Sequence, residues 1–169
     1  PLVNTKVEIR LADHPDLAGH VVRSVQGSLS RLSIETIDVL QVNNGPCAFP
    51  PEQGPQDYAR LWVEDYFRPG GVLEGLERVQ RAGYARHVGF ICRANDVVSI
   101  RRLIDTGLFR LINVPYTLLN PSAGRVAPSG PGPEQDFGGV IDYAQARGVG
   151  SAIYSPLASG DLTDAAIMG

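Results

Sequence analysis

The chain has 169 residues, 43% of them hydrophobic and 20% charged, a composition typical of one globular domain that buries a substantial core. Lysine and arginine number 15 against 18 acidic residues, a net charge of -3 without any basic cluster, which argues against a nucleic-acid binder. No apolar run approaches the roughly 18 residues of a membrane helix, and Cys47 and Cys92 fit no metal-ligand spacing, so we expect free thiols and a cytoplasmic protein.

Short apolar segments alternate along the chain with longer segments of helical periodicity. The predicted strands are residues 1–7, 36–42, 85–91, 110–116 and 150–157. They lack strict polar alternation, which is typical of strands buried on both faces of a parallel sheet. The predicted helices are residues 13–32, 70–83, 95–107 and 136–148.

The predicted helices carry apolar stripes and end signals. In the first helix one stripe holds Leu17, Val21, Val25 and Leu29. Asn95 or Asp96 is predicted to cap the start of the third helix. Glycines are predicted to end the second, third and fourth helices, namely Gly83, Gly107 and Gly148.

The alternation of strands and helices predicts a parallel α/β sheet with right-handed crossovers. Two architectures fit: an open doubly wound sheet or part of a (β/α)8 TIM barrel. Open dinucleotide-binding sheets usually carry G-x-G-x-x-G after the first strand, and no predicted strand here is followed by that spacing. A barrel takes about 250 residues. Residues 1–169 are predicted to form a single α/β domain of five parallel strands alternating with helices, either an open sheet or a partial TIM barrel.

Polar and aromatic residues cluster at the carboxyl ends of the predicted strands, where TIM barrels place their chemistry. Each of them alone also has a structural interpretation, as a solvated strand end, a backbone-bonded amide or a core aromatic residue. Their coincidence on one rim favours a site. They are Lys6, Asn43, Asn113, Tyr116, Tyr154 and Ser155.

Four segments of the chain resemble consecutive parts of the aldo-keto reductase superfamily, in order and at the expected spacing. They are "SLSRLSIETIDVLQVNN", "GVLEGLERVQRAGYARHVGF", "LIDTGLFRLINVPYTLLNPSAG" and "VIDYAQARGVGSAIYSPLASGDLT". The resemblance implies a (β/α)8 barrel that transfers hydride between a nicotinamide cofactor, NADP or NAD, and a small-molecule carbonyl, alcohol or sugar. On this alignment the chain covers strands three to seven.

The resemblance implies catalytic roles for two residues. Lys6 in "NTKV" matches the lysine whose charge lowers the pKa of an acid-base tyrosine. That tyrosine and its aspartate belong to the second strand, which the chain does not contain on this alignment. Asn43 stands five residues after Asp38, the spacing of the family's D-x-x-x-x-H. It thus occupies the carbonyl-polarising position with an amide, which donates a hydrogen bond but does not titrate.

The resemblance also implies cofactor contacts. Asn113 matches the residue that bonds the nicotinamide carboxamide, and Tyr154 in "AIYSPL" matches the aromatic residue that stacks on the nicotinamide ring. Ser155 and Leu157 match residues at the pyrophosphate. The segment "GFIC" departs from the usual G-V-S-N and places Ile91 and Cys92 at further carboxamide positions. No metal ligand set is expected.

The segment of residues 44–70 reads as a long substrate-loop-like insertion, since it gathers Trp62, Tyr66 and Phe67. An equally good interpretation is a short extra helix packed on the barrel.

Three functions remain open. The first is an aldo-keto reductase that is active when the missing strands complete the barrel, the chain alone being inactive. The second is a catalytically degenerate relative that serves as a binding or regulatory module. The third is that these residues form the whole natural product, an open five-stranded sheet whose unpaired edges favour oligomerisation or instability.

Overall fold

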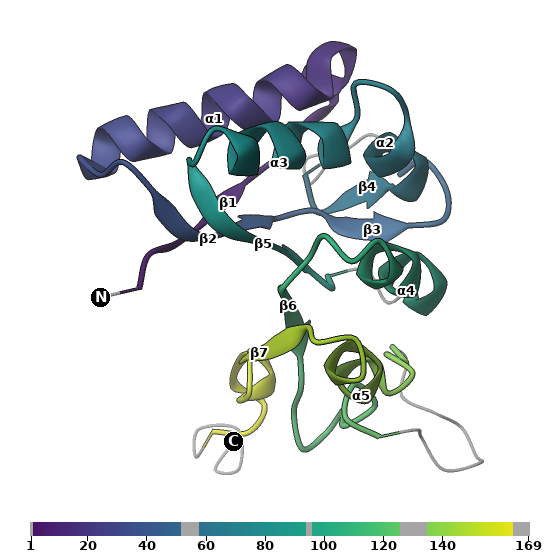
Figure 1. Cartoon of the computed structure of the whole chain (residues 1–169). Coiled ribbons are helices and arrows are strands. Elements are labelled where there is room, and N and C mark those ends of the chain that lie inside the picture. The colour runs from purple at the N-terminus through teal and green to yellow at the C-terminus, as the bar shows by residue number, and fades with distance from the viewer. Residues whose placement is uncertain (1, 52–57, 94–95, 126–134, 164–169) are drawn as a thin grey trace.

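The computed structural model describes residues 2–51, 58–93, 96–125 and 135–163. Five parallel strands form one sheet in the order β1-β2-β5-β6-β7 (Figure 1). They span Asn4–Val7 (β1), Ile37–Val42 (β2), Ala85–Ile91 (β5), Leu111–Pro115 (β6) and Gly150–Tyr154 (β7). Within the described residues β1 and β7 are edge strands, so the barrel is not closed. The predicted class, a partial barrel of five parallel strands alternating with helices, is confirmed.

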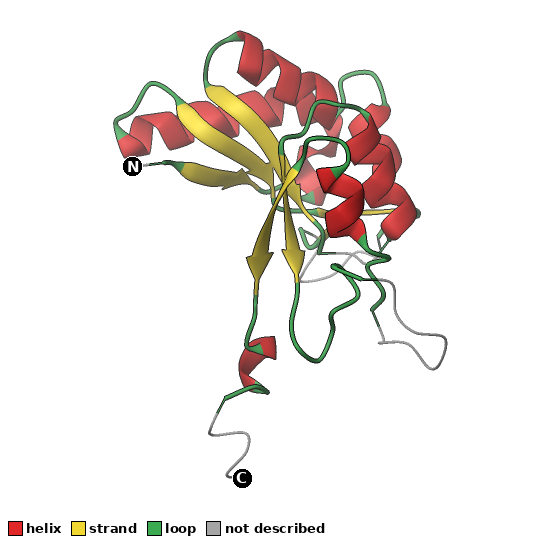
Figure 2. Cartoon of the chain, turned by 60° about the horizontal axis from the view of Figure 1, so that its bottom comes forward, coloured by secondary structure: helices red, strands yellow, loops and turns green. Residues whose placement is uncertain are grey.

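Helices separate the strands, and the longer helices lie on one side of the sheet (Figure 2). The four longer ones are α1 (Leu17–Leu32), α3 (Val72–Arg81), α4 (Val97–Asp105) and α5 (Val140–Gln145). Three short helical segments are η1 (Leu11–Asp16), α2 (Val63–Phe67) and η2 (Ala158–Gly160). A second, parallel pair of strands, β3 (Gly45–Cys47) and β4 (Arg60–Trp62), lies in the long segment after β2. No periodicity in the sequence predicted these three-residue strands.

Local chemistry explains where the helices begin and end. Asp96 accepts a hydrogen bond from the backbone N–H of Ser99 at 3.0 Å, so Asp96 caps α4 as predicted, while Asn95 lies outside the described residues. Asp16 caps α1 in the same way through Gly19 at 3.0 Å. Gly83 follows α3 with φ of +75°, a left-handed conformation that costs glycine little.

The core lies between the sheet and the helices. The predicted stripe of α1 is buried, and α1 packs on α3 at a close approach. A Cβ atom added at Gly75 of α3 would lie 2.9 Å from Cβ of Val21 and 3.0 Å from the backbone oxygen of Ala18. Because residue 75 is glycine and lacks a Cβ atom, α1 and α3 can pack at this short distance. The helices α1 and α3 together cover the core-facing side of β1, β2 and β5.

Candidate active site on the inner face of the sheet

Side chains along each strand alternate between two faces of the sheet. One face joins the core under the helices, through residues such as Val7, Leu40, Val88 and Ile112. The other face, which we call the inner face, carries the residues one position away. Strand register sets Lys6 opposite Gln41 and Gln41 opposite Gly89. The inner face thereby gathers Lys6, Gln41, Gly89, Asn113 and Tyr154.

A hydrogen bond joins Gln41 and Asn113 across this face. Nε2 of Gln41 donates to Oδ1 of Asn113 at 3.1 Å, although β5 runs between their two strands. Gly89 of β5 lets the bond pass, because a Cβ there would lie 3.3 Å from Cγ of Gln41 and 2.5 Å from the backbone oxygen of Leu111. Gln41 is fully buried, and its Oε1 has no hydrogen-bond partner among the described residues. Asn113 is half-buried, and its Nδ2 likewise bonds to nothing that the structure describes.

Lys6 lies exposed on β1, at the edge of the inner face. It forms no ion pair or hydrogen bond with any residue in the described part of the chain. Its register partner is Gln41, so Lys6 and Gln41 stand side by side on the inner face. The position leaves Lys6 available to a group brought in at this edge.

Asn43 lies just past β2 and is half-buried. Its Nδ2 donates to Oε2 of Glu8 at 3.4 Å, a long bond, and its backbone N–H donates to Val7 at 2.8 Å. Glu8 also pairs with Arg10. The amide predicted to polarise a carbonyl therefore borders a carboxylate, a neighbour that the sequence analysis did not identify. Extending the β1–β2 register by one inner-face step predicts this contact.

The neighbouring Asn44 has a structural role. It is fully buried, its Oδ1 accepts from the backbone N–H of Ile9 at 2.9 Å, and its Nδ2 donates to the backbone oxygen of Ile9 at 2.7 Å. The Tyr66 hydroxyl donates to the backbone oxygen of Asn44 at 3.1 Å. Asn44 thus joins the segment after β1 to the segment after β2. These bonds also fix the backbone next to Asn43.

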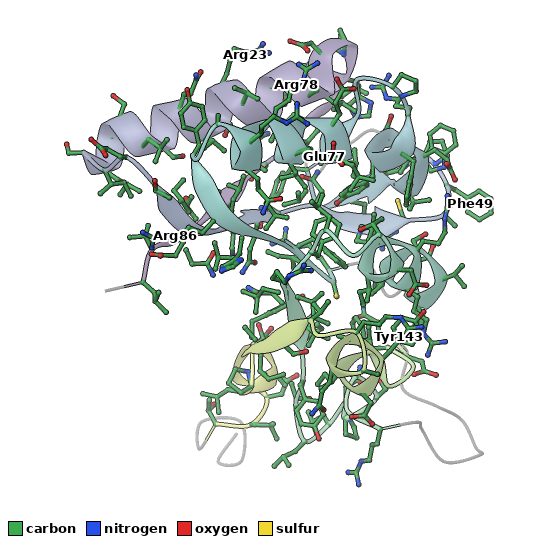
Figure 3. All side chains as sticks on the ribbon, in the orientation of Figure 1. Arg23, Phe49, Glu77, Arg78, Arg86 and Tyr143 are labelled. Carbon is green, nitrogen blue, oxygen red and sulfur yellow. The ribbon has the colours of Figure 1, made fainter. Side chains whose placement is uncertain are left out.

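The aromatic residues of the long segment after β2 differ in burial and in their contacts. Tyr66 of α2 is fully buried, and the Trp62 indole donates to the backbone oxygen of Ala48 at 3.0 Å. Phe67 is partly exposed, and Phe49 extends away from the sheet (Figure 3). Tyr66 therefore follows the interpretation of a short helix packed on the barrel. Residues 52–57 of this predicted substrate loop lie outside the described residues.

The "GFIC" segment divides between the two faces. Ile91 shares the inner face with Asn113, its register partner, and is buried. Cys92 lies in the core cluster under the helices, where burial raises the pKa of its thiol, and its backbone N–H donates to the backbone oxygen of Asn113 at 2.7 Å. The Cys92 side chain therefore lies on the opposite face of the sheet from Ile91 and Asn113.

The predicted cofactor residues of β7 lie at its carboxyl end. Burial raises the pKa of the half-buried Tyr154 phenol, with a smaller rise from Cys92 and an opposing effect of the Arg93 guanidinium. Ser155 is exposed and has φ of +53°, an uncommon left-handed conformation for serine, and Leu157 is 55% exposed. Together they form an outward turn next to the Tyr154 ring.

Further cations reach the rim of the inner face, and the sequence analysis missed them. The Arg10 and Arg93 guanidinium carbons lie 5.2 and 5.7 Å from the centre of the Tyr58 ring. Tyr116, predicted at the rim, packs partly buried against the core. The described ranges contain no group of three His, Cys, Asp or Glu side chains that could hold a metal ion. They also contain no helix with the length and apolar character of a membrane span.

Comparison with known proteins identifies the family. The profile of the Aldo/keto reductase family matches residues 1–167. The chain belongs to this family. No curated protein matches the sequence. The resemblance predicted from the four sequence segments is confirmed.

Solved aldo-keto reductases share the fold of this chain. Aldo-keto reductase AKR11C1 from Bacillus halodurans, in its holo form, superposes with a TM-score of 0.67 at 18% identity over 96% of this chain and 45% of its own. The Bombyx mori aldo-keto reductase AKR2E4, in complex with NADP, gives 0.55 at 19% identity over 91% and 41%. MGS-M4, an aldo-keto reductase from a Medee basin deep-sea metagenome, gives 0.61 at 14% over 95% and 46%. The chain therefore spans less than half the length of these relatives.

Proposed function

We propose that this protein is an NAD(P)-dependent oxidoreductase of the aldo-keto reductase type, acting on a small-molecule carbonyl, alcohol or sugar. The observation that carries the proposal is the polar inner face of a family-typical sheet, which carries Lys6, Asn43, Asn113 and Tyr154. Family membership supports the reaction class. The two free cysteines support a reducing compartment, which we propose to be the cytoplasm.

The inner face fits the nicotinamide group, which is a flat ring bearing a primary carboxamide. Asn113 offers a hydrogen-bond donor, Nδ2, that nothing described occupies, and Ile91 offers an apolar surface beside it. Tyr154 brings an aromatic ring on the adjacent strand. The outward turn at Ser155 and Leu157 is our candidate for the pyrophosphate contact. NADP is our first choice because a fold relative is solved with it.

Each residue then has a defined part in the reaction. The bound nicotinamide supplies or accepts the hydride. Asn113 and Tyr154 hold its ring on the inner face, Asn43 donates a hydrogen bond to the substrate oxygen, and Lys6 favours the ionised form of a phenol placed beside it. Glu8, which Asn43 contacts, competes for the same amide donor. Asn43 therefore orients the substrate without carrying a proton.

Activity requires the rest of a barrel. The edges of the described sheet, β1 and β7, present unpaired backbone groups that a closed barrel would pair. Lys6 lies on the β1 edge and Tyr154 on the β7 edge, so both borders of the proposed site face the gap. We propose that the chain is active only when further strands close this gap.

A second function is a barrel that binds a dinucleotide without catalysing hydride transfer. One observation favours it: the Asn43 amide already donates to Glu8. Such a protein keeps cofactor binding through Asn113 and Tyr154 and lacks turnover.

The test uses the protein at the length that its source cell makes, established by intact mass. Binding of NADPH and NADH is measured by calorimetry, and turnover of small aldehydes and sugars by the loss of cofactor absorbance. The reductase predicts binding and turnover, with Asn43→His raising kcat by up to about 10²-fold through general acid catalysis. Asn43→Ala is the matched control and should lower kcat. Binding without turnover in all three proteins would establish the second function, and no binding would refute both.

A further inference from the structure

We propose that Gln41 is a positioning residue that fixes the Asn113 amide with its Nδ2 toward the cofactor. The site then recognises the carbonyl oxygen of the nicotinamide carboxamide rather than its amino group. This inference rests on the proposed function and deepens it, because it assigns a hydrogen-bond polarity to the cofactor site. It adds a buried residue that the resemblance to the family did not assign.

The hydrogen bond sets this polarity. Nε2 of Gln41 donates and Oδ1 of Asn113 accepts, at 3.1 Å. Because an amide group has one oxygen and one nitrogen on the same carbon, holding Oδ1 against Gln41 leaves Nδ2 of Asn113 for a ligand. Asn113 is half-buried, so that donor is within reach of a molecule on the inner face, whereas Gln41 is fully buried and is not.

The opposite orientation of the pair is less favourable. If both amides turned over, the Gln41 amide would keep two buried N–H groups without acceptors, in place of one N–H group and Oε1. The strand on the other side of β2 presents Lys6 in register with Gln41, and a positive charge there favours the oxygen end of the Gln41 amide. This charge favours the direction of the bond that the structure has.

The backbone is shaped to permit this bond. Gln41 reaches across β5 only because position 89 is glycine, whose missing Cβ would lie 3.3 Å from Cγ of Gln41. The backbone around Asn113 is held as well, since its oxygen accepts the Cys92 N–H at 2.7 Å. Asn113 is therefore held both through its backbone, by Cys92, and through its side-chain amide, by Gln41. Such preorganisation favours binding through the Nδ2 donor.

The test compares two cofactors on the protein at its natural length. One is NADP⁺ and the other is its 3-acetylpyridine analogue, which keeps the carbonyl oxygen and replaces the amino group by methyl. A donor on Asn113 serves both, so the wild type should bind them with similar Kd. Asn113→Asp keeps the acceptor for Gln41 but presents an oxygen to the ligand. The ratio of Kd for the analogue to Kd for NADP⁺ should then rise about tenfold, the worth of one hydrogen bond.

The variant Gln41→Glu distinguishes a positioning role of Gln41 from a merely structural one, through the pH dependence of the Kd ratio. When protonated, the new carboxyl donates to Oδ1 of Asn113 as glutamine does; when ionised, it accepts from Nδ2 and turns the amide over. The ratio of Kd values should therefore rise with pH in this variant and stay constant in the wild type. Lys6 and His87, which lie on the same face, act on both dinucleotides alike, so their effects cancel in the ratio.

Gln41→Met is the matched control, because it removes the donor without reversing it. Both dinucleotides should bind more weakly by the same factor at every pH. A ratio that stays unchanged in Asn113→Asp, and at every pH in a folded Gln41→Glu, would overturn the positioning role while leaving the proposed function standing. A wild type that binds neither dinucleotide would overturn the proposed function and this inference with it.

Discussion

Replacing Asn44 by alanine should destabilise the fold far more than the same change at its neighbour Asn43. Asn44 is fully buried and satisfies both backbone groups of Ile9, at 2.9 and 2.7 Å. Alanine leaves that N–H and that carbonyl buried without partners, at about 1–3 kcal/mol each. We expect Asn44→Ala to lower the free energy of unfolding by about 2–6 kcal/mol.

Asn43→Ala is the matched control, since the residue type and the replacement are the same. Asn43 is half-buried and makes one long side-chain bond, 3.4 Å to Glu8, so we expect a loss of about 0.5 kcal/mol or less. Urea unfolding followed by far-UV circular dichroism measures both variants, and an unchanged m-value shows that the comparison is valid. Equal losses, or a larger loss at Asn43, would refute the assignment of Asn44 to structure and of Asn43 to the site.

Three further predictions test the packing and the electrostatics. Gly89→Ala should lower the free energy of unfolding in urea by about 1–3 kcal/mol, because the added Cβ would lie 2.5 Å from the backbone oxygen of Leu111. Gly150→Ala is the control and should be nearly neutral, because the nearest atom to its added Cβ lies at 3.5 Å. Equal losses in the two variants would contradict the close approach at Gly89. The Val3 N–H, bonded at 2.8 Å, and then Arg86 (Figure 3) hold the pKa of Asp38 below 3.8, so its contribution to stability is complete above that pH and is lost as the pH falls through the folded pKa. Asp38→Asn should therefore flatten the acid limb of the stability profile, and an unchanged limb would refute the shift. In the folded protein a thiol reagent should modify half-buried Cys47 and spare Cys92 until unfolding; early loss of both thiols would contradict the burial of Cys92.

Periodicity was enough to predict the main elements of the fold. The apolar stripe of α1 and the branched runs of the five strands matched the structure because burial on a helix or a two-sided strand imposes a repeat that many residues share. The β3–β4 pair was missed, since three residues are too few for a repeat to be recognised. The helix α2 corresponds to the short extra helix that the sequence offered as the alternative to a substrate loop. The predicted first helix also divides into η1 and α1, with Pro15 inside η1.

The candidate site was predictable where a residue stands at a strand end and less so where it depends on register. Gln41 and Cys92 show the difference. Gln41 sits inside a hydrophobic strand, and its partner Asn113 is set by strand order and by the glycine between them. Cys92 follows Val88 and Phe90 at intervals of two, and that parity alone predicts the core side on which it lies. Parity, applied strand by strand, would have found Gln41 and separated the side chains of Ile91 and Cys92.

The central claim, that a nicotinamide is held on the inner face by Asn113, is tested most directly by calorimetric titration of NADPH into the protein at its natural length and into Asn113→Leu. Our account predicts saturable binding to the wild type and about tenfold weaker binding to the variant, the loss of one hydrogen bond in a desolvated site. Circular dichroism should show both proteins equally folded, because Asn113 is half-buried. Equal affinity in the two proteins, or no binding to the wild type, would contradict the account.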